Sequence, residues 1–183
     1  ILVEDNPRYY SIILPLLYRT ALKHARNLIS KSLSDTDRLL LFRARPKIIL
    51  TSTYEEAIEF YNTYRNNILG MVSDVRFPIK GEINQSAGLK LTEYIRNKDS
   101  DMPIVLQSTN PKYHEEADKV NASFIHKESA TLLQDLEDFI VNNFGFGDFI
   151  FRDHKGKEIS RANDLKKFQH SLKKIPSKSL EYH

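Results

Sequence analysis

The stretch Pro103-Ile104-Val105-Leu106-Gln107-Ser108-Thr109 is apolar over three successive residues and ends on two hydroxyl side chains. Continuous rather than alternating apolar character is typical of a parallel strand that helices cover on both faces. Four similar stretches alternate with segments of helical periodicity, so the sequence predicts an α/β protein with a five-stranded parallel sheet. The other strands are expected at 1–3, 47–51, 68–73 and 123–126, and the helices at 7–42, 54–66, 87–97, 111–120 and 131–143.

Composition excludes several classes of protein. The 183 residues are 40% hydrophobic and 28% charged, which excludes collagen-like, disordered and low-complexity chains. The formal net charge of +3 is too small to indicate a nucleic-acid partner. The chain has no cysteine, so it has no disulfides or thiolate chemistry, and this suits a reducing cytoplasm. The longest apolar stretch, Ile12 to Tyr18, is far shorter than the roughly 20 residues of a membrane span, so we expect a cytoplasmic protein without a membrane segment.

The first helical region is longer than one crossover between parallel strands requires. Pro15 is expected to start, bend or interrupt its helix, and the run Ser34 to Phe42 resembles a cap followed by a second short helix. Two interpretations stay open: a longer helix or helix pair that packs locally, or a surface for a partner or for dimerisation. Because the chain begins at Ile1 inside a strand-like run, we expect it to be a piece of a longer protein.

The pattern changes after residue 143, so we expect a domain over 1–143 and an extension over 144–183. Segments 148–152 and 157–161, joined by Asp153-His154-Lys155-Gly156, predict a β-hairpin. A basic amphipathic helix is expected to follow and to end at Pro176, as a solvated linker helix or, alternatively, a nucleic-acid arm. Its apolar stripe is formed by Leu165, Phe168, Leu172 and Ile175.

Reactive side chains follow four of the five predicted strands. Because the carboxyl ends of parallel strands meet at one edge of a sheet, these side chains are expected to lie together. Three carboxylates there would repel one another unless a cation lies among them, and hard oxygen ligands suit Mg²⁺. A carboxylate beside Mg²⁺ and a lysine can form an aspartyl phosphate, so the site is interpreted as a phosphoryl acceptor. The residues are Glu4, Asp5, Asp74, Ser108, Thr109 and Lys127.

Five ordered motifs resemble those of the receiver domain of two-component response regulators, over about residues 1–143. The resemblance implies a flavodoxin-like, doubly wound sheet in the order 2-1-3-4-5, with a lengthened first helical region and the C-terminal hairpin and helix as additions. The motifs are Ile-Leu-Val-Glu4-Asp5-Asn, Val-Ser-Asp74-Val-Arg-Phe-Pro78, Ala87-Gly88-Leu89, Pro103-Ile-Val-Leu-Gln-Ser108-Thr109 and Phe124-Ile-His-Lys127.

The resemblance also implies roles for these residues. Asp74 would accept the phosphoryl group, and Glu4 and Asp5 would hold Mg²⁺ together with the backbone carbonyl of Arg76. Ser108 and Lys127 would contact the phosphoryl group. The aromatic switch would be Phe124, coupled to Ser108, with Thr109 as the alternative hydroxyl. Each residue also has a non-functional alternative. Glu4 and Asp5 could form a solvated acidic turn, and Lys127 could be a surface lysine. Ser108 could be a structural cap, and Phe124 could be a core residue.

The resemblance further implies partners. These are a sensor histidine kinase or a phosphotransfer protein, and an output domain further along the same chain. The chain would then accept a phosphoryl group without being a stand-alone metabolic enzyme. The segment after Phe144 is similar to the region behind the receiver in Bacteroidetes proteins of the phosphoenolpyruvate synthase or pyruvate phosphate dikinase type.

Two features depart from the receiver pattern. Glu128 follows Lys127 where the family usually has proline, and the chain between Pro78 and Gly88 is longer than usual. We expect that longer segment to be a loop beside Asp74, and it is either a lid or docking surface or a tolerated surface insertion.

Two other functions are alternatives to the phosphoryl acceptor. A degenerate receiver would act only as an interaction or dimerisation module. A phosphatase of the haloacid dehalogenase type would need an aspartate two residues after the nucleophile, where Arg76 stands.

Overall fold

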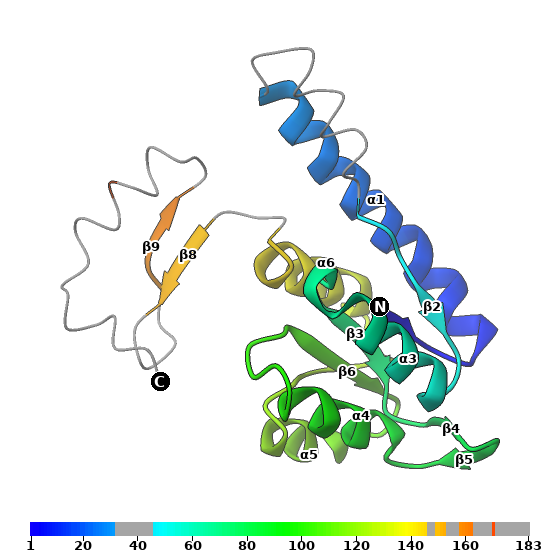
Figure 1. The fold of residues 1–183 in the computed structure, drawn as a ribbon. Helices are drawn as coiled ribbons and strands as arrows, with labels where there is room; N and C mark the ends of the chain where they lie inside the picture. The colour runs from blue at the N-terminus through cyan, green and yellow to red at the C-terminus, as the bar shows by residue number, and fades with distance from the viewer. Residues whose placement is uncertain (32–45, 146–148, 153–157, 163–169, 171–183) are drawn as a thin grey trace.

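The main sheet has five parallel strands in the order β2-β1-β3-β6-β7 (Figure 1). The computed structural model describes residues 1–31, 46–145, 149–152, 158–162 and 170, and the structural statements below concern these residues. Without the extra hairpin β4–β5 described below, the order is 2-1-3-4-5, which confirms the predicted flavodoxin-like class. The strands are β2 (Leu50–Thr51), β1 (Leu2–Val3), β3 (Met71–Asp74), β6 (Ile104–Ser108) and β7 (Ser123–His126).

Helices cover both faces of this sheet, as the apolar strands require. One core joins Leu2, Val72 and Val105 to the helices α1 and α6. The other joins Met71 and Leu106 to α3, α4 and α5. The helices are α1 (Pro7–Lys31), α3 (Tyr54–Tyr64, followed by a 3-10 turn at Arg65–Asn67), α4 (Ala87–Arg96), α5 (Tyr113–Lys119) and α6 (Leu132–Asn143).

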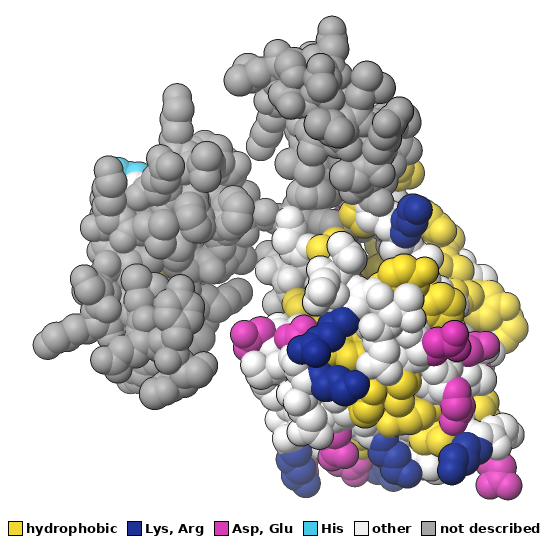
Figure 2. Space-filling model, in the orientation of Figure 1, with side chains coloured by type: hydrophobic (Ala, Val, Ile, Leu, Met, Phe, Trp, Pro, Cys, Tyr) yellow, Lys and Arg dark blue, Asp and Glu magenta, His cyan; other side chains and the backbone are white. Residues whose placement is uncertain are grey.

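Helix α1 forms the described part of the long first helical region. It runs for 25 residues with Pro15 inside it, so the proline does not end the helix. Its start is capped by the Asn6 side chain, which accepts the N–H of Arg8. Three apolar side chains on α1, Ile12, Tyr18 and Leu22, are exposed by 44%, 51% and 40%. Figure 2 shows hydrophobic side chains on the surface over this helix. The second helix expected at Ser34 to Phe42 lies outside the described residues.

The long segment after Asp74 forms an antiparallel hairpin of β4 (Phe77–Ile79) and β5 (Glu82–Asn84). Its two-residue turn has positive φ at Lys80 (53°) and Gly81 (83°), as a type I′ turn requires. Phe77 is fully buried and anchors the hairpin to the core. The segment expected as a loop is therefore ordered by its own backbone pairing and by one aromatic side chain.

The predicted C-terminal hairpin is present as β8 (Phe149–Arg152) antiparallel to β9 (Glu158–Ala162). The turn expected at 153–156 and the helix expected to end at Pro176 lie outside the described residues. No helix in the described part of the chain is long and apolar enough to cross a membrane.

Candidate functional site

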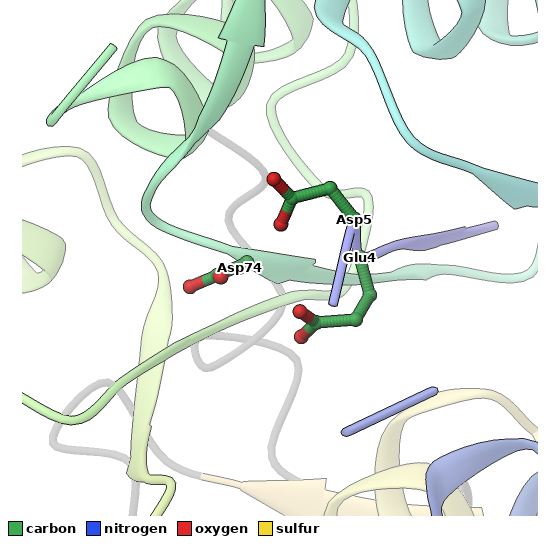
Figure 3. Close-up of side chains that lie close together, drawn as sticks. All are labelled: Glu4, Asp5 and Asp74. Atoms are coloured by element: carbon green, nitrogen blue, oxygen red, sulfur yellow. The ribbon is translucent and has the colours of Figure 1, made fainter. Parts of the chain in front are cut away.

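Three carboxylates meet at the carboxyl edge of the sheet (Figure 3). Glu4 and Asp5 follow β1, and Asp74 ends β3. Each offers an oxygen within 4.8 Å of the oxygens offered by the other two. Because β1 and β3 are neighbours in register, the strand pairing itself places these residues side by side.

A buried lysine neutralises part of this charge. Lys127, which follows β7, places its Nζ 2.6 Å from Glu4 Oε2 and 2.7 Å from Asp74 Oδ2. The side chains of Lys127 and Glu4 are 3% and 1% exposed, so this ion pair is shielded from water. The second oxygen of each of these two carboxylates accepts a backbone N–H group. The N–H of Asn6 donates to Glu4 Oε1, and the N–H of Val75 donates to Asp74 Oδ1.

Two of the three carboxylates have raised pKa values, chiefly because they are buried. Burial raises the pKa of Glu4 to about 7, against the opposing charge of Lys127 and with a further contribution from Asp74. Burial and the charge of Asp74 also raise the pKa of Asp5. The cluster holds three carboxylates and one ammonium group, and hard oxygen donors in this number fit a divalent cation such as Mg²⁺.

Gly88 lets helix α4 approach the end of β3. Its N–H donates to the carbonyl of Val75. A Cβ at this position would lie 2.3 Å from the Asp74 carbonyl oxygen and 2.9 Å from Val75 Cα. Both of these are backbone atoms, so neither can move aside without shifting β3 or α4.

Replacing Gly88 with alanine is therefore expected to destabilise the protein by about 1–3 kcal/mol, the usual cost of overpacking a core. This is opposite in sign to the roughly 1 kcal/mol that alanine normally gains over glycine within a helix. Urea unfolding measures the change, and Lys90→Ala, at an exposed position of the same helix, is the control. A Gly88→Ala variant as stable as the wild type would contradict the close approach.

A cleft of about 650 Å³ opens beside Asp74. Six of the predicted site residues line it: Asp5, Asp74, Arg76, Ser108, Thr109 and Lys127. The Glu4 side chain is 1% exposed and does not line the cleft. Ser108 is buried, and its Oγ accepts the N–H of Asn110.

Phe124 lies elsewhere. It lines a separate hollow with Pro111 and His114, and its ring meets the His114 ring edge-on at 5.7 Å. The structure thus brings the predicted acceptor Asp74, the metal residues Asp5 and Arg76 and the two hydroxyl residues to one cleft. It buries Glu4 next to Asp5 and Asp74 and places the predicted aromatic switch on the neighbouring surface.

Two aromatic residues of the cleft were missed by the sequence analysis. Lys127 Nζ lies 4.2 Å from the centre of the Tyr9 ring, which adds a cation–π contact to its two ion pairs. Tyr113 donates from its hydroxyl to the carbonyl of Gln85 and so joins the start of α5 to the segment between β5 and α4. Neither residue belongs to a motif, so the sequence carried no signal for them.

Comparison with known proteins adds two structures. No family model matches the chain, and no curated protein matches it. The N-terminal domain of an uncharacterized protein from Wolinella succinogenes covers 75% of this chain and 89% of its own, at 18% identity and a TM-score of 0.47. The second structure is the phosphorylated cyanobacterial phytochrome response regulator RcpA. The match covers 87% of this chain and 96% of RcpA, at 14% identity and a TM-score of 0.46. Because both scores are below 0.5, the fold assignment rests on the sheet order.

Proposed function

We propose that this chain is a phosphoacceptor module that takes a phosphoryl group onto Asp74. The observation that carries the proposal is the ion pair of buried Lys127 with Asp74, beside two further carboxylates and the Ser108 hydroxyl. A structural ion pair needs no adjoining cleft and no surplus of carboxylates. Here both are present, and burial, with a further contribution from the charge of Asp74, raises the pKa values of Glu4 and Asp5.

In the proposed step an oxygen of Asp74 forms a bond to phosphorus while the bond from phosphorus to the donor breaks. The electron pair of that bond leaves with the donor, which is a phosphohistidine imidazole or, in a test, acetate. Lys127 faces the negative charge on the phosphoryl oxygens, and the Ser108 hydroxyl donates to one of them. Glu4, Asp5, Asp74 and the Arg76 carbonyl would hold Mg²⁺, which supplies further positive charge to the phosphoryl oxygens when bound.

The donor and the output follow from the same proposal. A sensor histidine kinase or a phosphotransfer protein would supply the phosphoryl group. The change would pass through Phe124 and Thr109 to an output domain of the same chain, of the phosphoenolpyruvate synthase type. This would make the described part a switch and not a metabolic enzyme in its own right.

The test is the intact mass of the full chain after incubation with acetyl phosphate. We expect a gain of one phosphoryl group in the presence of Mg²⁺, none when EDTA replaces it, and loss of the group with hydroxylamine, which cleaves acyl phosphates. No gain, together with no Mg²⁺ affinity by calorimetry, would overturn the proposal.

A second candidate is an interaction module that uses the receiver-like site only as structure. The exposed apolar residues Ile12, Tyr18 and Leu22 on α1 favour it, because such side chains mark contact surfaces, including that of a homodimer. Unlike the phosphoacceptor, an interaction module is expected to have no Mg²⁺ affinity, and Asp74→Asn is expected to have no effect on its binding to a partner. Sedimentation of the Tyr18→Glu variant tests the homodimer.

A further inference from the structure

The ammonium group of Lys127 has more N–H bonds than carboxylate partners. Its Nζ lies 2.6 Å from Glu4 Oε2 and 2.7 Å from Asp74 Oδ2, and among the described residues no third oxygen accepts from it. An ammonium group carries three N–H bonds, so one of them points elsewhere. The structure shows one further partner, the ring of Tyr9, whose centre lies 4.2 Å from Nζ.

Tyr9 and Glu4 contact Lys127 from the same short segment. Tyr9 lies in the first turn of α1, where its N–H donates to the carbonyl of Asn6. The N–H of Asn6 in turn donates to Glu4 Oε1. These bonds fix the backbone that carries both the aromatic ring and the Glu4 carboxylate.

Lys127 needs such a support because its side chain is flexible and starts far from the proposed acceptor. It follows β7, and β6 lies between that strand and β3, which carries Asp74. A lysine ends in a strongly hydrated ammonium group on a flexible four-carbon stem. Lys127 lines the cleft of about 650 Å³, yet its side chain is only 3% exposed. Tyr9 lines the same cleft and is half-buried, so its ring takes the place of water beside the ammonium group.

We propose that Tyr9 is a positioning residue for phosphoryl transfer, whose ring holds the Lys127 ammonium group beside Asp74. The inference rests on the proposed function. A lysine that is already fixed and dehydrated next to Asp74 loses no freedom and sheds no water when the phosphoryl charge arrives there.

An aromatic ring suits this role better than another carboxylate would. The negative face of the ring attracts a cation, and it does so more strongly where water is excluded. It supports the ammonium group without neutralising it, so the charge of Lys127 stays available to the phosphoryl oxygens. A further carboxylate at this place would compete with those oxygens for the same charge.

Substitutions at position 9 in the full chain test the proposal. We expect Tyr9→Leu to gain the phosphoryl group from acetyl phosphate and Mg²⁺ about tenfold more slowly than the wild type, the size of a cation–π contact shielded from water. Tyr9→Phe keeps the aromatic face and is expected to react as fast as the wild type. Intact mass followed over time measures the rate.

The matched control is Tyr10→Leu. Tyr10 packs against the same core as Tyr9, but it does not line the cleft. Its replacement removes a similar aromatic side chain from the same helix turn, and the rate of phosphoryl gain is expected to stay at the wild-type value. The control separates a loss of packing from the loss of the ring beside Lys127.

Two further measurements act on the ring and on the contact directly. Fluorinated phenylalanines at position 9 make the face of the ring less negative with little change in shape, so the rate is expected to fall as fluorine atoms are added. The protons next to Lys127 Nζ are expected to show NMR signals shifted upfield by the ring current in the wild type and in Tyr9→Phe. Tyr9→Leu should lose this shift, and Lys127→Met, which lacks the signal, assigns it.

Four outcomes would overturn the inference. A wild-type rate in Tyr9→Leu, or an equal loss in Tyr10→Leu, would make Tyr9 a core residue only. A constant rate across the fluorinated series would mean that the shape of the ring, and not its charge, acts on Lys127. A wild-type chain that gains no mass with acetyl phosphate would remove the proposed function, and this inference with it. That last result is recognised from the wild type alone, while the upfield shift still reports the contact between the ring and Lys127.

Discussion

Replacing Asp74 with asparagine is expected to abolish the gain of a phosphoryl group from acetyl phosphate while leaving the fold intact. A neutral carboxamide is a far weaker nucleophile than a carboxylate, because its oxygen carries no charge and its nitrogen lone pair is delocalised into the carbonyl, so the loss should be complete. The fold should survive because the asparagine Oδ1 can still accept the N–H of Val75, and Lys127 keeps its ion pair with Glu4. Intact mass measures the loss, and circular dichroism checks the fold.

The control for this substitution is Asp101→Asn. Asp101 is exposed, and it does not line the cleft. The Asp101→Asn variant should gain the phosphoryl group from acetyl phosphate as fully as the wild type. Continued labelling of Asp74→Asn would place the acceptor elsewhere, and peptide mapping after borohydride reduction would then locate it.

Replacing Lys127 with methionine is expected to cost about 3–5 kcal/mol of stability at pH 8 in EDTA, the range found when one partner of a buried ion pair is removed. The methionine fills similar space but leaves Glu4 and Asp74 without their shared counter-ion. Lys112→Met is the matched control, because Lys112 is an exposed lysine of the same cleft. This variant should lose little free energy of unfolding.

The loss in Lys127→Met is expected to depend on pH. In the wild type the pKa of Glu4 is already raised from 4.5 to about 7 in the folded protein, chiefly by burial. A folded protein whose carboxyl pKa is raised binds more protons than the unfolded chain, so its stability falls as the pH rises between these values. Removing Lys127 takes away the charge that opposes this rise, so the pKa should go higher and the loss should extend above pH 7.

Urea unfolding at pH 5.5 and pH 8 tests the pH dependence. We expect a smaller loss at pH 5.5, where Glu4 is protonated, and partial recovery at pH 8 when Mg²⁺ replaces EDTA. Equal losses at the two pH values would mean that packing, and not charge, determines the effect of Lys127.

The sequence analysis predicted the strand hairpin after Asp74 only as a loop, for identifiable reasons. Its strands are three residues long, and Pro78 lies in the first of them, which argues against a strand in isolation. The Lys80-Gly81 pair was the available signal, since both residues adopt the positive φ of a hairpin turn. Burial of Phe77 then stabilises a pairing that local sequence alone leaves weak.

The sequence by itself determined the sheet and the edge at which the chemistry gathers. Apolar runs that end on Glu4, Asp74, Ser108 and Lys127 predict parallel strands, and parallel strands bring their carboxyl ends together whatever the details of packing. This kind of information is local: it lies in the order of residues along each strand.

Only the tertiary structure decided how the side chains at that edge meet. The ring of Tyr9 covers Lys127, the backbone of Asp74 leaves no room for a Cβ at Gly88, and Gln107 of β6 is the register partner of Asp74. Each of these depends on the register of neighbouring strands and on how the helices lie against them. Register and helix placement arise from the packing of the whole core, to which residues distant in sequence contribute together, so no single motif encodes them.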